Sequence, residues 1–577
     1  MKKSDYNRNV ADKAARLNTI VATIRRKRQK TNPNRGKKKN TRKKKDKKMN
    51  LAKKLTATIL AVISALTFIA CSDITDSSSS SGGGNTERSD EAKLTFVSIN
   101  DIHGTIEQDA DGLHGLSNTA KIIDKMSANY ASGGDVRDDV VLFGNGDMFQ
   151  GTAISNLSKG RAVIEAMNAM RFDGMGLGNH EFDWGLDVVT AYFDGDESNG
   201  EANFPLVAAN VYQKSQSRYI ADESLTDNIV NGLIVEKSGV KVGLIGVIGP
   251  CENSILQKRV ADYSFREEYI TNRVKDVATE LRNDGAEIIS VNVHWGDYYN
   301  EELANIKSGS DYLVDVIFNG HTHQQYKDEI RRGDGRYVPV VQGGRYNEAV
   351  AYVKLTYSTV NGNVEINSYG CKKVSDYEDE YDDTVENVVS SYAETLIDNL
   401  PVLATSAVTV NHAYTLTGYV GKLMTKALDS DYSASNYGGL RSNGDIEANK
   451  PIKEDAFYKI IPFDNAVYLV EIQGKGLYEY YENCYVQPDS DSKRHYFGKS
   501  DTAKNFSELK NDENYYTLAI IDYVYTGTYF SPYKKYIRKE TETPLLLRDL
   551  LVEDAKLFGA ANVKWSYSNE PLLGSLR

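Results

Sequence analysis

The stretch Leu94-Thr95-Phe96-Val97-Ser98-Ile99-Asn100-Asp101-Ile102-His103-Gly104 joins a short, largely apolar run to a polar end. A run of β-branched and aromatic residues that stops at Asn and Asp predicts a buried strand followed by a loop. We therefore expect Asp101 and His103 to lie just beyond the carboxyl end of a strand.

Three more runs have the same form, at residues 140–143, 288–293 and 314–318. Open sheets in α/β proteins usually bind their ligands at the carboxyl ends of their strands. The runs therefore predict an α/β fold that gathers the polar segments after them at one edge. These segments are Gly146-Asp147, His294-Trp295-Gly296 and Gly320-His321-Thr322-His323.

Histidine is concentrated in these three segments, in Asn100-Asp101-Ile102-His103-Gly104 and in Gly178-Asn179-His180-Glu181-Phe182-Asp183. The five segments together hold five of the protein's eight histidines. Carboxylate and imidazole groups together suit Zn, Mn, Fe or Co, whereas an oxygen-only set would suit Mg or Ca. No cysteine lies in the five segments. We predict two divalent metal ions, Zn, Mn or similar, as the cofactor. The candidate ligands are Asp101, His103, Asp147, Asn179, His294, His321 and His323.

The spacing within two segments predicts how their side chains point. In an extended chain, residues i and i+2 face the same side, so Asp101 with His103, and His321 with His323, could converge on one site. Taken singly, a surface loop, a capped helix start or a core histidine explains each segment as well. Their joint occurrence, in order and mostly after strand-like runs, favours the metal centre. We expect structural roles for the three remaining histidines, His114, His412 and His495.

The order Asp-Ile-His-Gly, Gly-Asp, Gly-Asn-His-Glu-Phe-Asp-Trp-Gly, His-Trp-Gly, Gly-His-Thr-His resembles the calcineurin-like metallophosphoesterase superfamily and its bacterial 5′-nucleotidase/UDP-sugar hydrolase family. The resemblance implies a four-layer α/β/β/α domain that hydrolyses phosphoric esters with a metal-activated water. It also implies one metal held by Asp101, His103, Asp147 and His323, and another held by Asp147, Asn179, His294 and His321. His180 and Asp183 match the family's catalytic dyad, with His180 as general acid and Asp183 orienting its ring.

The family joins this domain to a smaller, mixed α/β domain that binds the nucleotide. Residues 434–441 and 460–465 resemble the family's Asn-x-Gly-Gly-Ile-Arg and Leu-Pro-Phe-Gly-Asn stretches. Glycine lets a backbone approach a ligand, Arg grips phosphate and an exposed aromatic ring stacks on a base. The alternative is an ordinary glycine turn with a surface Arg and a core Phe. The substrate-binding residues implied are Asn436, Gly438, Gly439, Arg441, Phe463 and Tyr523.

Two departures from the family pattern leave the substrate open. The stretch Ala413-Tyr414-Thr415-Leu416-Thr417-Gly418-Tyr419 has no basic residue where the family has an Arg that contacts substrate. The family's Gly-Gly-Asp-Gly turn near Tyr523 is replaced by Thr526-Gly527-Thr528-Tyr529. Beside nucleotides, the open substrates are cyclic-nucleotide diesters, nucleotide sugars and thiosulfate esters. A non-catalytic nucleotide-binding surface lipoprotein is the alternative of a different class.

The length of 577 residues exceeds what one hydrophobic core supports, so we predict more than one domain. The catalytic domain is expected at 92–370, an acidic and helical linker at 371–400 and the substrate-binding domain at 401–577. Apolar spacing in residues 388–397 predicts an amphipathic helix that ends near Pro401. Cys251, Cys371 and Cys484 allow at most one disulfide among themselves.

Charge divides the chain unevenly. Residues 1–70 hold 22 Lys and Arg against 3 Asp and Glu, whereas residues 71–577 hold 47 against 77, a net charge near −30. An acidic body argues against nonspecific nucleic-acid binding. We therefore expect a nucleotide or related phosphoester as partner and no nucleic acid, with the oligomeric state left open.

Residues 49–71 have the pattern of a secretory signal. Lys53-Lys54 precedes an apolar run, Leu55 to Ala70, which is short for a membrane span and ends at Cys71. Because this pattern resembles a bacterial lipobox, we expect a lipid anchor on Cys71, a flexible tether at 72–91 and export to the bacterial cell envelope, in the periplasm or at the cell surface. An uncleaved membrane anchor is the alternative. The basic segment 1–48 is either a basic arm or untranslated sequence upstream of Met49.

Overall fold

The computed structural model of the chain describes residues 89–108, 115–222, 228–266, 269–377, 379–441, 446–490 and 493–576. All of them belong to one compact unit, Arg88–Arg577. The basic segment, the signal sequence with Cys71, nearly all of the tether and His114 lie outside the described residues. Within the described residues, no helix combines the length and the apolar character needed to span a bilayer.

The first sheet has seven strands in the order β18-β17-β1-β2-β3-β4-β7. Strands β1 to β4 and β7 pair in parallel, whereas β17 pairs antiparallel with β1 and β18 pairs antiparallel with β17. The predicted strands at 94–99 and 140–143 are confirmed as parts of β1 and β2. The strand bounds are β1 Glu91–Ile99, β2 Val140–Asn145, β3 Gly174–Gly176, β4 Leu206–Val207, β7 Ile229–Val230, β17 Ala349–Ser358 and β18 Val364–Lys373.

The second sheet has six strands in the order β15-β16-β14-β11-β9-β8. Its four central strands are parallel, and β8 and β15 form antiparallel edges. The predicted strand at 288–293 is confirmed in β11, and the one at 314–318 begins two residues later, in β14. The strand bounds are β8 Gly232–Lys237, β9 Val240–Ile248, β11 Ile288–His294, β14 Val316–Asn319, β15 Gln325–Arg331 and β16 Tyr337–Gly343.

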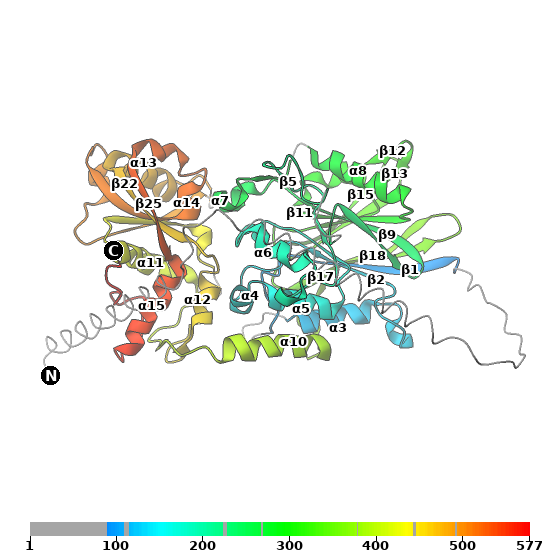
Figure 1. Cartoon of the computed structure of the whole chain (residues 1–577), viewed down its shortest axis with the longest axis horizontal. Coiled ribbons are helices and arrows are strands. Elements are labelled where there is room, and N and C mark those ends of the chain that lie inside the picture. Colours follow the sequence, from blue (N-terminus) through cyan, green and yellow to red (C-terminus); the bar gives the residue numbers. More distant parts are fainter. Residues whose placement is uncertain are drawn as a thin grey trace, which may run out of the picture. The chain divides into compact units, whose positions relative to one another are not determined.

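The two sheets face each other, and helices cover their outer faces (Figure 1). Side chains alternate along β1, so that Phe96 packs between the sheets and its neighbour Val97 packs under helices. Helix α8, Ile270–Asn283, covers the second sheet through residues such as Val274. The first sheet is covered by helices α3 Leu116–Met126, α4 Ala153–Ser158, α5 Arg161–Met170, α6 Leu186–Thr190 and α10 Asp383–Ala393.

A separate five-stranded sheet, in the order β23-β20-β24-β22-β25, forms the carboxyl-terminal part. Together with the four layers it confirms the predicted fold class, an α/β/β/α domain followed by a smaller α/β domain. The strands are β20 Tyr432–Asn436, β22 Ala466–Gln473, β23 His495–Lys499, β24 Tyr515–Ile521 and β25 Ile537–Leu546, and the helices are α11 Thr417–Leu428, α12 Glu454–Ile460, α13 Gly474–Tyr481, α14 Asp522–Thr526 and α15 Leu547–Ala560.

The predicted amphipathic helix before Pro401 is confirmed by α10, which continues as a π-helical turn over Glu394–Asp398. Asp382 caps α10 by accepting hydrogen bonds from the N–H groups of Thr384 and Val385. The domain boundaries at 370 and 401 stay predictions.

The remaining short strands and α-helices are β5 Tyr212–Gln213, β6 Arg218–Tyr219, β10 Tyr263–Ser264, β12 Lys307–Ser308, β13 Asp311–Tyr312, β19 Ala404–Thr405, β21 Pro451–Ile452, α7 Gln257–Val260 and α9 Asn300–Ala304.

Candidate metal centre and catalytic site

The carboxyl ends of β1, β2, β11 and β14 bring six of the seven candidate ligands together, because these parallel strands all end at the same edge of their sheets. Their ligand atoms form two groups, each with all its atoms within 4.8 Å of one another. The first, here called the Asp101 group, contains Asp101, His103, Asp147 and His323. The second, here called the His294 group, contains Asp147, His294 and His321. Asp147 belongs to both groups, as expected of a bridging carboxylate.

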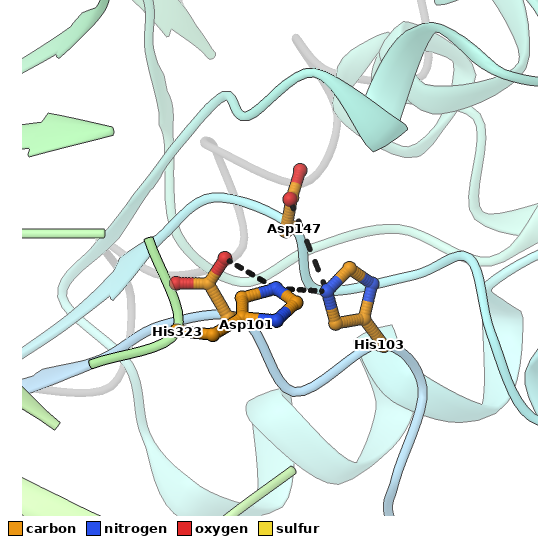
Figure 2. A group of neighbouring side chains, drawn as sticks. All are labelled: Asp101, His103, Asp147 and His323. Carbon is orange, nitrogen blue, oxygen red and sulfur yellow. Dashed lines mark hydrogen bonds and ion pairs between the residues drawn. The ribbon is translucent and has the colours of Figure 1, made fainter. Parts of the chain in front are cut away.

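Figure 2 shows the side chains of the Asp101 group close together, with dashed lines that join His103 to Asp147 and to His323, and His323 to Asp101. The Nε2 atoms of His103 and His323 are 3.0 Å apart. Asp147 Oδ2 is 4.0 Å from His103 Nε2, and Asp101 Oδ1 is 3.5 Å from His323 Nε2. Nitrogen lone pairs and carboxylate oxygens thus converge on one point, which is the arrangement of a cation's ligands.

The His294 group is completed by Asn179, whose Oδ1 is 2.8 Å from His321 Nδ1. His294 Nε2 is 3.3 Å from Asp147 Oδ2. That Nε2 atom is buried and has no hydrogen-bond partner. A buried ring nitrogen without a hydrogen-bond partner needs an explanation. Binding of a metal ion between this nitrogen and the Asp147 carboxylate would provide one.

Hydrogen bonds at the opposite ring nitrogens orient two of the histidines. His103 Nδ1 donates to the backbone oxygen of Gln150 at 3.1 Å, and His294 Nδ1 donates to that of Asn145 at 2.8 Å. Both bonds direct Nε2 toward the centre, as outer partners of metal-binding histidines do. The chemistry and placement of these groups fit a pair of divalent ions.

Burial and neighbouring charge set the protonation of the histidines. Burial lowers the pKa of His103 well below its ordinary value and that of His321 to about 4, so both rings are neutral. Burial also disfavours a charged His294, but Asp147 outweighs it and raises the pKa of His294 to about 10. A cation in the His294 group would replace that proton.

The prediction that an extended chain aligns the two His-containing pairs is wrong. Asp101, His103, His321 and His323 have φ angles of 53°, 49°, 70° and 59°, which are left-handed rather than extended. The side chains of His321 and His323 also do not share one site: His321 belongs to the His294 group and His323 to the Asp101 group. A left-handed conformation costs a non-glycine residue about 1–2 kcal/mol, and such strain gathers at functional sites. The side chains converge through loop geometry and not through strand alternation.

A buried carboxylate that sequence reasoning missed, Glu181, joins the two loops that carry Asp147 and Asn179. Its Oε2 accepts hydrogen bonds from the N–H groups of Asp147 at 2.8 Å and Gly178 at 2.7 Å. Its Oε1 accepts one from Met148 at 2.8 Å. Close contact of the loops requires glycine, since a Cβ on Gly146 would lie 2.5 Å from Gly178 N.

The predicted dyad is placed together beside the ligand groups. His180 Nδ1 is 2.8 Å from Asp183 Oδ2, and the backbone N–H of His180 donates to Asp147 Oδ1 at 2.8 Å. Burial disfavours the charged ring, but Asp183 and Asp147 outweigh it and raise the pKa of His180 to about 9. The ring is therefore protonated at neutral pH and can donate a proton. Because Nδ1 contacts Asp183, the donating nitrogen is Nε2.

All six predicted substrate-binding residues line one cavity of about 260 Å³, here called the Tyr523 cavity. Asp147, Asn179, His180, Asp183, His321 and His323 line the same cavity. The Phe463 ring is stacked on His180 with centroids 5.6 Å apart, and the Arg441 guanidinium lies 5.0 Å from the Phe463 centroid. The structure therefore joins the predicted base-binding and phosphate-binding residues to the dyad. The six residues are Asn436, Gly438, Gly439, Arg441, Phe463 and Tyr523.

The loop that carries Phe463 is held by side chains that sequence reasoning also missed. The buried guanidinium of Arg548 donates to the backbone oxygens of Ile461 and Pro462 at 3.1 and 3.0 Å. Gln150 Nε2 donates to the same Pro462 oxygen at 2.5 Å. Because the Gln150 backbone oxygen accepts from His103, this one residue connects the Asp101 group to the Phe463 loop.

The two departures from the family pattern have structural counterparts. Tyr414, in the stretch without a basic residue, stacks on Tyr437 with centroids 4.7 Å apart and rings 11° from parallel. Thr526 is the last residue of α14 and residues 527–529 follow it; Asp522, the first residue of this helix, is fully buried. An aromatic pair therefore occupies the stretch that lacks the family's Arg.

The residues left out of the site prediction lie apart from the ligand groups. His495 is a buried core histidine whose Nδ1 shares a hydrogen bond with Tyr480 Oη at 2.7 Å, and His412 is exposed. Among the described residues the three cysteines are free thiols, consistent with the limit of one disulfide.

Comparison with known proteins relates the first part of the chain to a protein family. Residues 94–325 match the family model of the calcineurin-like phosphoesterases. The chain is 29% identical to the endonuclease YhcR of Bacillus subtilis over 67% of its own length and 32% of that protein. It is also 29% identical to the snake venom 5′-nucleotidase of Crotalus adamanteus, over 47% of the chain and 46% of the relative. The chain thus spans about a third to a half of the length of these curated relatives.

Among solved structures, a 5′-nucleotidase precursor from Thermus thermophilus has the same fold. The two superpose with a TM-score of 0.63 at 19% identity, over 81% of this chain and 96% of the other. The family model spans every residue of both ligand groups and the dyad. Residues 94–325, with the centre they enclose, therefore form a calcineurin-like phosphoesterase domain.

Proposed function

We propose that the protein is a metal-dependent phosphohydrolase that releases phosphate from nucleotides, as a 5′-nucleotidase does. The observation that carries the proposal is the lining of the Tyr523 cavity. It joins ligands of both metal groups and the dyad to Arg441, Phe463 and Tyr523. One cavity therefore holds groups for a phosphoryl centre and groups for a nucleoside.

The Asp101 group would hold one divalent ion, and the His294 group with Asn179 would hold the other. The bound pair would lower the pKa of water and neutralise charge that develops on the phosphoryl oxygens. Asp147, which contributes to both groups, would be a ligand of both ions. Asp101 is itself held in place by Asn100, whose Nδ2 donates to its Oδ2 at 2.6 Å.

His180 is the group that protonates the leaving oxygen. Water forms the new bond to phosphorus, the bond from phosphorus to the nucleoside oxygen breaks, and that oxygen takes the proton of His180 Nε2. The proton lost by the attacking water passes to solvent, from which His180 is protonated again. Asp183 holds the ring through Nδ1 and stabilises its charged form.

The other side of the Tyr523 cavity positions the substrate. Phe463 and Tyr523 provide aromatic rings for a base, and Arg441 provides the cation for phosphate. Gly438 and Gly439 let the backbone approach the ligand. These roles assign the nucleoside to the carboxyl-terminal domain and the phosphoryl group to the metal centre together with Arg441.

The test is phosphate release from a panel of nucleoside monophosphates, cyclic nucleotides and nucleotide sugars, with and without a chelator. The proposal predicts chelator-sensitive release from nucleoside monophosphates. Preference for cyclic nucleotides or nucleotide sugars would support the two enzymatic alternatives, which the missing family Arg keeps open. Binding of nucleotides without turnover on any member would support a non-catalytic surface protein.

We also propose that the protein is exported and lipid-anchored through Cys71 in the bacterial cell envelope. Support comes from the Lys53-Lys54 start, the apolar run and the cysteine that follows it. Labelling of the bacterial host with a radioactive fatty acid should mark the wild-type protein and not Cys71→Ser. Labelling of both proteins, or of neither, would contradict lipid attachment at Cys71.

A further inference from the structure

Asp464 stands where the family stretch Leu-Pro-Phe-Gly-Asn has glycine, and it follows Phe463 directly. Its side chain lines the Tyr523 cavity. Because glycine has no side chain, every contact of the Asp464 carboxylate is an addition to the family pattern. The partners of this carboxylate come from both domains.

One partner of Asp464 lies in each domain. Its Oδ1 is paired with the buried guanidinium of Arg548 in the carboxyl-terminal domain. Its Oδ2 accepts a hydrogen bond at 3.1 Å from Nζ of Lys159, a residue of the calcineurin-like phosphoesterase domain. Burial disfavours the charged carboxylate, but Arg548 and Lys159 outweigh it and lower the pKa of Asp464. Asp464 and Lys159 thus form an ion pair between the domains, here called the Asp464 bridge.

Lys159 also contacts the loop that carries the dyad. It follows α4 directly and has a left-handed φ of 54°. Its Nζ lies 4.9 Å from the ring centroid of Trp184, a buried residue that follows Asp183 in the sequence. A cation over an indole face is attracted by the ring. The Asp464 bridge therefore connects the Phe463 loop to the loop of His180 and Asp183.

Tyr523, the second aromatic residue of the cavity, has an acidic neighbour with a similar contact. Oδ2 of the fully buried Asp522 is 3.4 Å from Nζ of Lys258, in α7 of the calcineurin-like phosphoesterase domain. The same Nζ donates to Glu542 Oε1 at 2.8 Å. Asp522, Lys258 and Glu542 are here called the Asp522 bridge.

The two bridges are joined within the carboxyl-terminal domain. Asn465, which follows Asp464, donates from Nδ2 to Asp522 Oδ1 at 3.1 Å. The Tyr523 N–H donates to the same oxygen at 2.8 Å. Each aromatic residue of the cavity is therefore next to a carboxylate that pairs with a lysine of the other domain.

The exposure of the two lysines favours a role in positioning over a role in folding. The side chains of Lys159 and Lys258 are 50% and 40% exposed. Ion pairs as exposed as these contribute little to stability. They do bear on the distance from the aromatic rings to the metal ligands, and a displacement of about 1 Å can lower a reaction rate about 100-fold.

We propose that the Asp464 bridge and the Asp522 bridge together position the base-binding rings, so that the phosphorus of a bound nucleotide meets the metal centre and His180. The inference rests on the proposed nucleotidase function and goes beyond it. It assigns positioning roles to Lys159 and Lys258, which are not part of the wall of the Tyr523 cavity. A phosphoester without a base does not use the rings, so its hydrolysis does not depend on the bridges.

The test compares the wild type with Lys159→Gln, Lys258→Gln, their double variant and the control Lys125→Gln. Lys125 is a matched lysine of the same domain that pairs with Glu380. kcat and KM are measured for AMP and for glycerol 2-phosphate, which has no ring. We expect kcat/KM for AMP to fall about fivefold in each single variant and about tenfold or more in the double variant. The value for glycerol 2-phosphate should change less than about twofold.

Lys159→Arg and Lys258→Arg keep the charge and should stay near the wild type. A loss in the arginine variants as large as in the glutamine variants would overturn the inference. So would an equal loss on AMP and glycerol 2-phosphate, since it would indicate a general defect, and so would glutamine variants that match Lys125→Gln.

Absence of turnover in the wild type would refute the proposed function instead. Calorimetry on the metal-loaded protein would still test the bridges through binding. AMP should then bind more weakly to the double variant than to the wild type, whereas inorganic phosphate should bind equally to both. Equal affinities for AMP would overturn the inference.

Discussion

The buried Glu181 carboxylate accepts a hydrogen bond from the backbone N–H of Asp147 at 2.8 Å. The same carboxylate binds the N–H of Gly178, so it fixes the distance between the loop of the shared ligand and the loop of Asn179. We predict that Glu181→Gln, which replaces one acceptor oxygen by a donor, lowers metal affinity by about 10–100-fold. The metal content of purified protein, measured by elemental analysis at limiting metal, checks this prediction.

The matched control for this change is Glu165→Gln, in an exposed pair with Arg161 at 2.8 Å. That variant should keep the wild-type metal content. Equal metal content in Glu181→Gln and the wild type would remove Glu181 from its positioning role.

Asp147→Asn is predicted to abolish turnover and to lower occupancy of both metal positions. The reason is that Asp147 belongs to both ligand groups, so its negative charge serves two cations. Metal titration followed by calorimetry measures the two affinities. Loss of only one ion would show that Asp147 is not shared.

His180→Asn is predicted to retain both metals and to lower kcat by about 10²–10⁴-fold, the usual contribution of a positioned proton donor. His180 touches the centre through its backbone N–H, which the variant keeps. Steady-state kinetics and metal content are measured on the same preparation. Metal loss as large as that in Asp147→Asn would contradict the proton-donor role.

Phe463→Ala is predicted to raise KM for nucleotides about tenfold, because stacking contributes about 1–3 kcal/mol per base. The KM for a small phosphoester without a base should change much less. Parallel kinetics on AMP and p-nitrophenyl phosphate compare the two effects. An equal increase in both constants would argue against base stacking at Phe463.

The stability of the carboxyl-terminal sheet is predicted to fall as the pH decreases from about 6.5 toward 4. Burial lowers the pKa of His495 to about 4. In this window the unfolded chain binds a proton that the folded chain excludes, so acid favours unfolding, and above pH 6.5 the effect vanishes. Between pH 7 and 5 the wild type should lose about 2 kcal/mol more than His495→Asn.

Urea unfolding of wild type and His495→Asn at both pH values measures that difference. The asparagine keeps an acceptor for Tyr480 Oη but does not titrate. Identical pH dependence in the two proteins would show that His495 is not the titrating group.

The sequence predicted the strands and the segments that follow them because burial imposes a local pattern. Residues 94–99 of β1 and all of β11 are continuous buried runs, and their ligands lie at the end of the strand or within a few residues of it. The parallel pairing then brings the segments together without further information. For the same reason, the seven candidate ligands could be named before their geometry was known.

The local backbone of the ligands could not be predicted in the same way. Asp101 and His321 have left-handed φ angles that nothing in a residue pattern of Asp and His indicates. Tertiary contacts impose them, such as the hydrogen bond from the His321 N–H to Asp101 Oδ2 at 2.9 Å. The spacing argument therefore named residues that do lie together, but it assumed the wrong backbone conformation.

The other site residues that the sequence did not predict depend on contacts between distant parts of the chain. Gln150 and Pro462 are separated by 312 positions, and neither belongs to a motif that signals the bond between them. Glu181 lay inside a quoted motif, but its function depends on the loop at Asp147. The Tyr523 cavity likewise is lined by residues from distant parts of the chain, such as His180 and Tyr523.

The central claim is that Asp147 is shared by two divalent ions whose other ligands come from distant segments. Crystals of the metal-loaded protein, with diffraction measured at the absorption edge of the bound metal, test it most directly. The account predicts two anomalous peaks, one within the Asp101 group and one within the His294 group, with Asp147 bonded to both. A single peak, or ions bound away from these residues, would contradict it.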